Sequence, residues 1–235
     1  MKIKRILKGI LIKLKGNKKH LKRGIKLNFK WYGHRHGSLG FNVCPTMLNK
    51  DSIVYSFGIG EDVSFDESII ERHGCKVFGF DPTPRSVEWV NKRDTPDEFH
   101  FLDYGIGEKT EMVDFFLPKN QDHISGSIAA HNHLKSEDYI KVQMKSIKDI
   151  SSELKHPKIN LLKLDIEGGE YAVLPSILNS GVIIDQFLIE FHEHFFDNGK
   201  DKTVLALESL REKGYEIFAI SDSYNEISFV RKSLV

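Results

Sequence analysis

The feature that most restricts the fold of this chain is an alternation of two kinds of segment: short apolar runs, and longer stretches whose apolar residues recur every three or four positions. The short runs are typical of buried strands and the periodic stretches of amphipathic helices. Strands that alternate with helices form a parallel sheet covered on both faces. We therefore expect a Rossmann-like α/β fold with a doubly wound, mostly parallel sheet. The expected strands are 53–57, 77–80, 99–102, 160–164 and 187–191, and the expected helices are 65–73, 85–92, 147–154, 171–178 and 203–213.

Two pairs of strand-like segments depart from this alternation. Residues 112–117 and 140–144 are expected to form an added strand pair joined by a polar loop. Residues 215–220 and 226–231 are close enough to form a hairpin, which places an antiparallel strand at or near one edge of the sheet. Residues 31–45 contain glycines and a proline, so we expect irregular structure there.

The first 30 residues differ in charge from the rest of the chain. They hold twelve of the 34 Lys and Arg residues and none of the 33 Asp and Glu residues, so a basic arm precedes a body with a net charge of −11. Apolar residues at positions 3, 6, 7, 10, 11 and 14 share one helical face. A basic amphipathic helix binds an anionic membrane surface, or it docks on the body or on a second copy of the chain, and these alternatives stay open. We divide the chain into an arm, 1–30, and a domain, 31–235.

Cysteine content and hydropathy bear on the compartment. Cys44 and Cys75 are the two cysteines, which are too few for a disulfide framework and fit a reducing environment. No apolar run approaches the roughly 18 residues of a membrane-spanning helix. We expect a cytoplasmic protein, with the arm as a peripheral contact at the inner face of the membrane as the further alternative.

Glycines and an acidic residue follow the first two expected strands, where an open parallel sheet binds ligands. Gly58 and Gly60 let the backbone approach a ligand closely, and Asp81, 21 residues after Gly60, is placed to accept hydrogen bonds from a ribose. Asp81 could instead cap the turn that follows it. A nicotinamide cofactor favours a third glycine where this chain has Val63, and the acidic Glu61 suits a sulfonium better than a pyrophosphate, which favours S-adenosylmethionine. The predicted cofactor-binding residues are Ser56, Phe57, Gly58, Ile59, Gly60, Glu61, Asp81, Pro82, Tyr104, Gly105 and Asp165.

The densest acidic cluster follows the strand at 160–164. Asp165 and Glu167 are candidate site residues, because unpaired carboxylates are costly to bury and strand ends face the ligand edge. Alternation along the next strand would place Glu190, His192 and His194 on one face, where a histidine near neutral pKa could act as a general base. We predict no metal site because no firm ligand spacing is present, although a divalent cation stays an alternative. The predicted catalytic residues are His192, Asp165, Glu167 and Glu190.

Several motifs together resemble the FkbM-type family of S-adenosylmethionine-dependent methyltransferases, over roughly residues 31–231. The strongest is KLDIEGGE at 163–170, which is similar to the family's Asp-[Val/Ile]-Glu-Gly-x-Glu signature. GFDPTP at 79–84, Gly105-Ile106-Gly107 and SIKDI at 146–150 support it. The chain departs from the family's first glycine loop, since Ser56 stands in an acidic position and Asp62 replaces the last glycine. Glu61 is then a candidate for the contact with the cofactor's amino group.

The resemblance implies O-methylation of a sugar or another hydroxylated acceptor, often for bacterial surface polysaccharides. The polar stretch 119–139 would cover that acceptor as a lid. We expect a small-molecule or glycan acceptor, with a homo-oligomer left open. The alternatives are a nucleic-acid methyltransferase that grips phosphates with the arm, an NAD-dependent oxidoreductase, and a membrane-binding module without activity; the acidic body makes nucleic acid the weaker partner.

Overall fold

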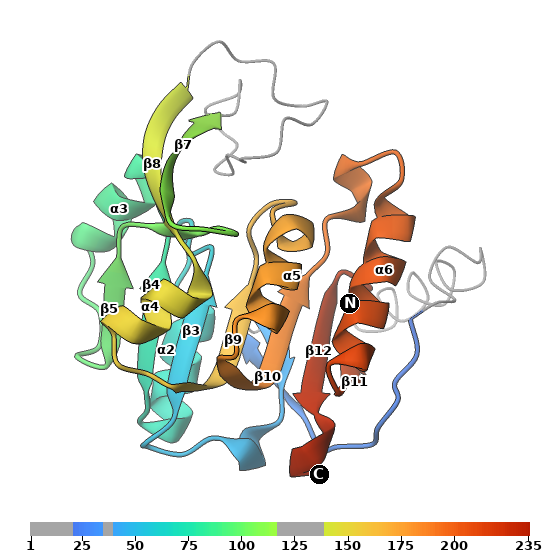
Figure 1. The fold of residues 1–235 in the computed structure, drawn as a ribbon. Coiled ribbons are helices and arrows are strands. Elements are labelled where there is room, and N and C mark those ends of the chain that lie inside the picture. The colour runs from blue at the N-terminus through green and yellow to red at the C-terminus, as the bar shows by residue number, and fades with distance from the viewer. Residues whose placement is uncertain (1–20, 35–39, 117–138) are drawn as a thin grey trace.

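The computed structural model describes residues 21–34, 40–116 and 139–235. Its centre is a seven-stranded sheet with the order β11-β12-β10-β9-β3-β4-β5 (Figure 1). Neighbouring strands from β5 to β10 run parallel, whereas β12 runs antiparallel to both β10 and β11. The strands of this sheet are β3 (Ile53–Phe57), β4 (Lys76–Phe80), β5 (Phe99–Leu102), β9 (Lys158–Leu164), β10 (Ile183–Glu190), β11 (Tyr215–Ile220) and β12 (Glu226–Arg231).

This order confirms the predicted Rossmann-like fold. Numbered along the chain, the seven strands read 3-2-1-4-5-7-6, which is the doubly wound order 3-2-1-4-5-6 with one antiparallel strand inserted. The inserted strand is β12, the second arm of the predicted C-terminal hairpin, and it lies next to the edge strand β11. The chain leaves β3 toward β4 on one side and reaches β9 on the other, so the switch in strand order falls between β3 and β9.

Helices cover both faces of the sheet, and each face has its own apolar core. Helices α4, α5 and α6 bury residues such as Ile150, Leu174 and Leu207 against one face. Helices α2 and α3 bury residues such as Ile69 and Val90 against the other. The helices are α2 (Ser64–His73), α3 (Pro84–Asn91), α4 (Ile147–Glu153), α5 (Glu170–Asn179) and α6 (Gly199–Glu212).

Residues 31–45 are more regular than predicted. Strands β1 (Lys30–Gly33) and β2 (Gly40–Val43) pair antiparallel and pack against α2. The side chain of Gln186 bonds both the amide and the carbonyl of Cys44, so buried polar groups on the sheet anchor the segment that follows β2. Gly33 and Gly40 lie at the ends of these two strands, where they do not prevent pairing.

Of the predicted arm, the structure describes residues 21–30, and the amphipathic helix expected before them lies outside the described residues. Leu21 is buried in the main core, and the backbone amides of Gly24 and Ile25 both donate to the carbonyl of Ile217. The last third of the arm therefore lies along β11 as part of the domain. No helix in the described ranges is long and apolar enough to cross a bilayer.

A second sheet stands above the carboxyl ends of the central strands (Figure 1). It contains β6 (Gly105–Ile106), β7 (Glu111–Phe116) and β8 (Tyr139–Lys145), and the antiparallel pairing of β7 with β8 confirms the added strand pair. The polar stretch predicted as a lid, 119–139, lies almost entirely outside the described residues.

Candidate functional site

A cavity of about 500 Å³ opens at the carboxyl ends of β3, β4 and β9, next to the switch point. Its volume lies within the range of small-molecule sites, and its position is the one that open α/β sheets use for ligands. Five segments line it: the glycine loop after β3, the turn after β4, the β6–β7 segment, β8 through Met144, and the loop from β9 into α5.

Most predicted site residues line this cavity, but four do not. Ser56 is fully buried in β3, and Tyr104 packs its ring against Phe80 with 5.5 Å between centroids, so both belong to the core rather than to the ligand surface. Glu190 and His192 lie behind the loop that carries Asp165. The predicted residues that line the cavity are Phe57, Gly58, Ile59, Gly60, Glu61, Asp81, Pro82, Gly105, Asp165 and Glu167.

The glycine loop adopts backbone conformations that side chains would disturb. Gly58 has a φ of +82°, and a Cβ atom there would lie 1.7 Å from the carbonyl oxygen of Asp165. Gly60 has a φ of +56°. The loop after β3 thus passes directly against the loop after β9, and glycine at position 58 is required for this contact.

Asp81 organises this loop from β4. One carboxylate oxygen accepts hydrogen bonds from the amides of Ile59, at 3.1 Å, and Gly60, at 2.9 Å. The other accepts from the amide and the hydroxyl of Thr83, at 2.9 and 2.6 Å. These four donors match the roughly four acceptor positions of a carboxylate, so a ribose hydroxyl would bond Asp81 only by displacing one of them. The structure shows the capping interaction, and ribose binding stays a prediction.

The two acidic residues that follow Gly60 already have partners. Glu61 forms a two-pronged ion pair with Arg85, with nitrogen–oxygen distances of 2.7 and 3.0 Å. Asp62 accepts from the amide and the hydroxyl of Ser64 at the start of α2. Glu61 still lines the cavity, but its charge is shared with a guanidinium, and contact with the cofactor's amino group stays a prediction.

The acidic loop after β9 is held in a strained form beside the cavity. The amide of Asp165 donates to the carbonyl of Phe57, which ties the start of the loop to β3. Glu167 has a φ of +53°, a left-handed conformation that costs a residue with a side chain about 1–2 kcal/mol. Strain of this kind persists where the surroundings fix the side chain, and it is concentrated at functional sites.

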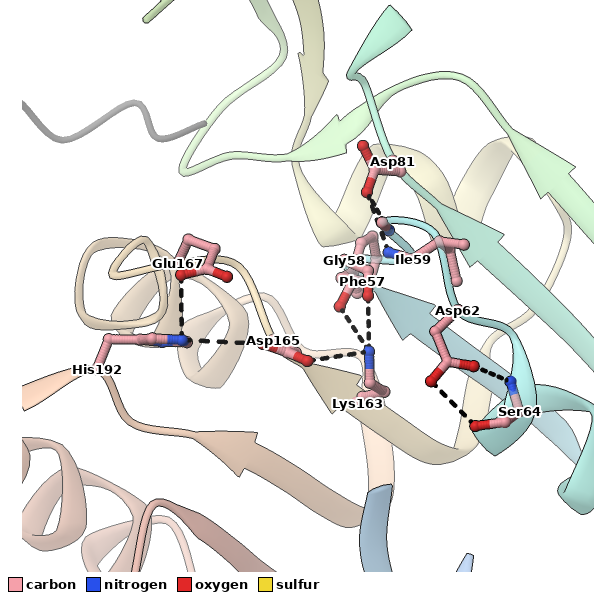
Figure 2. Close-up of polar contacts among 11 residues, drawn as sticks. Phe57, Gly58, Ile59, Asp62, Ser64, Asp81, Lys163, Asp165, Glu167 and His192 are labelled. Carbon is pink, nitrogen blue, oxygen red and sulfur yellow. Dashed lines mark hydrogen bonds and ion pairs between the residues drawn. The ribbon is translucent and has the colours of Figure 1, made fainter. Parts of the chain in front are cut away.

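His192 lies behind these carboxylates and is 5% exposed. Its Nε2 atom is 3.4 Å from Glu167 Oε2 and 4.0 Å from Asp165 Oδ1, and its Nδ1 atom is 3.2 Å from Oε1 of the fully buried Glu170 (Figure 2 shows the first two contacts). Burial alone would lower the pKa of His192, but the hydrogen bond to Glu170 and the charges of the three carboxylates outweigh it and raise that pKa to about 10. The raised pKa favours the doubly protonated, hydrogen-bond-donating imidazole, and the role of His192 as the general base stays a prediction.

Two expectations about the next strand are also corrected. Strand β10 ends at Glu190, and His192 precedes a short 3-10 turn, Glu193–Phe195, so Glu190, His192 and His194 do not share the face of one strand. In the antiparallel register of β10 and β12, Glu190 lies opposite Glu226. Burial and, after it, the nearby charge of Asp165 raise the pKa of Glu190 well above its usual range.

Asp165, Glu190 and His192 each offer a ligand atom within 4.8 Å of the others, which is close enough to surround one cation. A divalent cation held by these three groups stays an alternative to the predicted absence of a metal site.

Comparison with known proteins identifies this arrangement. A family model described as the methyltransferase FkbM domain matches residues 39–217, three quarters of the chain. The chain belongs to the FkbM methyltransferase family. The human protein named probable methyltransferase-like protein 24 is 26% identical over 208 residues, which cover 83% of this chain and 50% of that protein. Its Rattus norvegicus counterpart is 24% identical over the same shares. The chain thus spans about half the length of the curated relatives it matches.

Solved structures with a related arrangement include the METTL16 methyltransferase domain, at 9% identity and a TM-score of 0.45, covering 76% of this chain and 58% of that one. Aeropyrum pernix fibrillarin in complex with S-adenosyl-L-methionine is similar at 10% identity and a TM-score of 0.38, covering 78% and 66%. At these values the likeness says nothing about what the chain binds.

The family implies S-adenosylmethionine, and the cavity fits that group. Its volume suits a ligand of this size, and backbone without side chains at Gly58 and Gly60 leaves room for close approach. Asp165 and Glu167 line the same cavity and offer negative charge to a sulfonium or an ammonium. Gly105 completes the wall near Pro82.

Sequence reasoning missed three contributors to the site. Glu170, the last residue of the KLDIEGGE run, is fully buried and accepts from the amides of Gly168 and His192. Lys163 is buried beneath the glycine loop. One face of β7 lines the cavity through Glu111, Val113 and Phe115, and their spacing of two residues was the available signal.

Proposed function

We propose that this protein is an S-adenosylmethionine-dependent O-methyltransferase that acts on a sugar hydroxyl of a glycan or glycoconjugate. The observation that carries the proposal is that one cavity combines a glycine loop at the switch point with the carboxylates of Asp165 and Glu167. The glycine loop suits a nucleoside-bearing methyl donor, and the carboxylates suit an acceptor that must lose a proton.

When bound, S-adenosylmethionine supplies a methyl group on a positively charged sulfur: the carbon–sulfur bond breaks, a carbon–oxygen bond forms, and the sulfur keeps the electron pair. The residues of the chain hold the acceptor oxygen in line and take up its proton. Asp165 or Glu167 receives that proton, because both line the cavity and His192 is already protonated. His192 and Glu170 act behind them and fix their orientation.

Two points support a glycan acceptor: the resemblance to the FkbM family, which implies hydroxylated acceptors, and the carboxylate groups that line the cavity. Carboxylates accept hydrogen bonds from sugar hydroxyls, and Asp165 and Glu167 are both partly exposed, with side-chain exposures of 22% and 28%. The basic residues 1–30 would bring the domain to an anionic membrane surface where lipid-linked glycans are assembled. A free sugar or another hydroxylated metabolite offers the same chemistry.

The test is transfer of isotopically labelled methyl from S-adenosylmethionine to a panel of sugars, glycans and RNA. We expect methylated sugar hydroxyls in the product. Asp165→Asn and Glu167→Gln should lower turnover by about 100-fold or more if the residue is the base. Asp51→Asn, which changes an exposed aspartate, serves as the control. Labelling of RNA with a steep loss at higher salt would instead support a nucleic-acid acceptor, and no transfer to any acceptor would contradict the proposal.

A further inference from the structure

We infer that Lys163 is a positioning residue whose buried ammonium group holds the Gly58 carbonyl and the Asp165 carboxylate together, and thereby sets the shape of the cofactor cavity. The inference rests on the proposed function. It concerns a residue that does not line the cavity.

The contacts of Lys163 reach both sides of the switch point. The residue lies on β9 and is 6% exposed. Its Nζ atom donates to the carbonyl oxygen of Gly58 at 2.7 Å and lies 3.5 Å from that of Phe57 (Figure 2). The same atom is 3.6 Å from Asp165 Oδ2. One ammonium thus connects the loop after β3 with the loop after β9.

The contacts of Lys163 lie where the loop after β3 packs directly against the loop after β9. A Cβ atom on Gly58 would lie 1.7 Å from the Asp165 carbonyl oxygen, so the two backbones are in close contact. The carbonyl oxygens of Phe57 and Gly58 and the carboxylate of Asp165 all lie within 3.6 Å of the ammonium, whose positive charge offsets the repulsion among them. Without it, the loops would separate and the cavity wall formed by Gly58 and Asp165 would change shape.

A second buried carboxyl group interacts with the ammonium. Asp66 in the first turn of α2 is 1% exposed and interacts electrostatically with Lys163. Burial raises the pKa of Asp66 to about 6, and the charge of Lys163 limits that rise. The hydroxyl of the fully buried Ser56 also lowers the pKa of Asp66 through a side-chain hydrogen bond. The Lys163 ammonium therefore serves as the counter-charge of the buried Asp66 carboxylate.

Because Lys163 is also the counter-charge of Asp66, weaker binding in a single Lys163 variant could result either from the lost contact with Gly58 or from a destabilised core. Lys163→Met would leave Asp66 buried without its counter-charge, and loss of one partner from a buried pair destabilises a protein strongly. The double variant Lys163→Met/Asp66→Asn removes both charges, so no unpaired charge remains in the core. Thermal stability should recover in the double variant, but the anchor on the Gly58 carbonyl stays absent.

The experiment is calorimetric titration of the full chain with S-adenosylhomocysteine, with thermal unfolding in parallel. Binding should weaken about tenfold or more in both the single and the double variant, because a hydrogen bond from a charged group typically contributes a factor of this size. Lys158→Met is the matched control: Lys158 lies on the same strand and pairs with Asp185 at 2.7 Å, at the opposite end of β9. It should bind like the wild type.

Titration with S-adenosylmethionine separates position from charge. S-adenosylmethionine carries a positive sulfur and S-adenosylhomocysteine does not. If Lys163 acted only through its charge, its removal would strengthen binding of S-adenosylmethionine relative to that of S-adenosylhomocysteine. A positioning role predicts that both weaken by the same factor. Wild-type affinity in the stable double variant would overturn the inference and leave the proposed function intact. Failure of the wild type to bind either ligand would instead overturn the proposed function, and the inference with it.

Discussion

Replacement of Glu170 with glutamine removes one charge from the buried network around His192 and keeps the length of the side chain. Glu170 is fully buried, and its carboxylate accepts from the amide of His192 at 2.8 Å as well as contacting the ring. It is the largest of the influences that raise the pKa of His192 to about 10. We expect the pKa of His192 to fall in Glu170→Gln, because burial is then opposed by fewer charges.

The size of the effect follows from the pKa. A rise from 6.5 to about 10 corresponds to about 5 kcal/mol in favour of the charged imidazole. A hydrogen bond to a charged group accounts for about 1.5–3 kcal/mol of that amount, which predicts a fall of the pKa by about one to two in the variant. The folded-state pKa lies above the unfolded one. The stabilisation is therefore complete below pH 6.5, and it is lost as pH rises toward 10.

The direct assay is an NMR titration of the His192 ring nitrogens in the wild type and in Glu170→Gln. Unfolding by denaturant supports it: the wild-type free energy of unfolding should fall by about 1.4 kcal/mol per pH unit from His192 between pH 7 and 9, and the raised pKa of Glu190 adds a fall of the same sign. Glu88→Gln, at an exposed site on α3, is the control. A wild-type His192 that titrates near or below 6.5 would refute the reasoning.

Three further predictions concern backbone strain and buried charge. Gly58→Ala should abolish binding of S-adenosylhomocysteine, because its Cβ would meet the backbone of Asp165. Gly74→Ala, at a φ of +61° with open space around it, should cost only about 1–2 kcal/mol of stability and leave binding intact, and equal binding by the two variants would contradict this. Glu167→Gly and Glu167→Ala should both lose turnover, but the glycine variant should be about 1 kcal/mol more stable than the alanine variant in urea unfolding, because glycine tolerates the φ of +53°. Equal stability of the two variants would count against backbone strain at this position. The wild-type free energy of unfolding should fall by up to about 3 kcal/mol between pH 4 and pH 7 through Asp66, because a folded-state pKa of about 6 against 3.8 makes the charged form costly as pH rises. A fall of the same size in Lys163→Met/Asp66→Asn would contradict the buried charge.

The sequence predicts the fold well because its signals are local. Each strand and helix of the central sheet lies within a few residues of its expected range, since apolar runs and periodic stretches report burial directly. Gly74 ends α2 in a left-handed conformation, as its position after a periodic stretch predicts. The strands β1 and β2 were not predicted, because their pairing joins two four-residue segments that are too short to show a period.

The site was predicted less completely, since contacts across the sheet decide it. Position at a strand end correctly places Asp165 and Glu167 on the cavity. The usual pKa of histidine predicts a base at His192, and the sequence gives no sign of the buried Glu170, 22 residues away in the chain, which raises that pKa. Lys163 is an interior residue of a central strand, and only the carbonyls of the neighbouring loop show why a charge is tolerated there.

The measurement that tests the central claim most directly is calorimetric titration of the purified chain with S-adenosylhomocysteine, with NAD as the comparison. The account predicts saturable binding of S-adenosylhomocysteine to the wild type, loss of that binding in Gly58→Ala, and no binding of NAD. Binding of NAD alone, or S-adenosylhomocysteine binding that Gly58→Ala leaves unchanged, would contradict it.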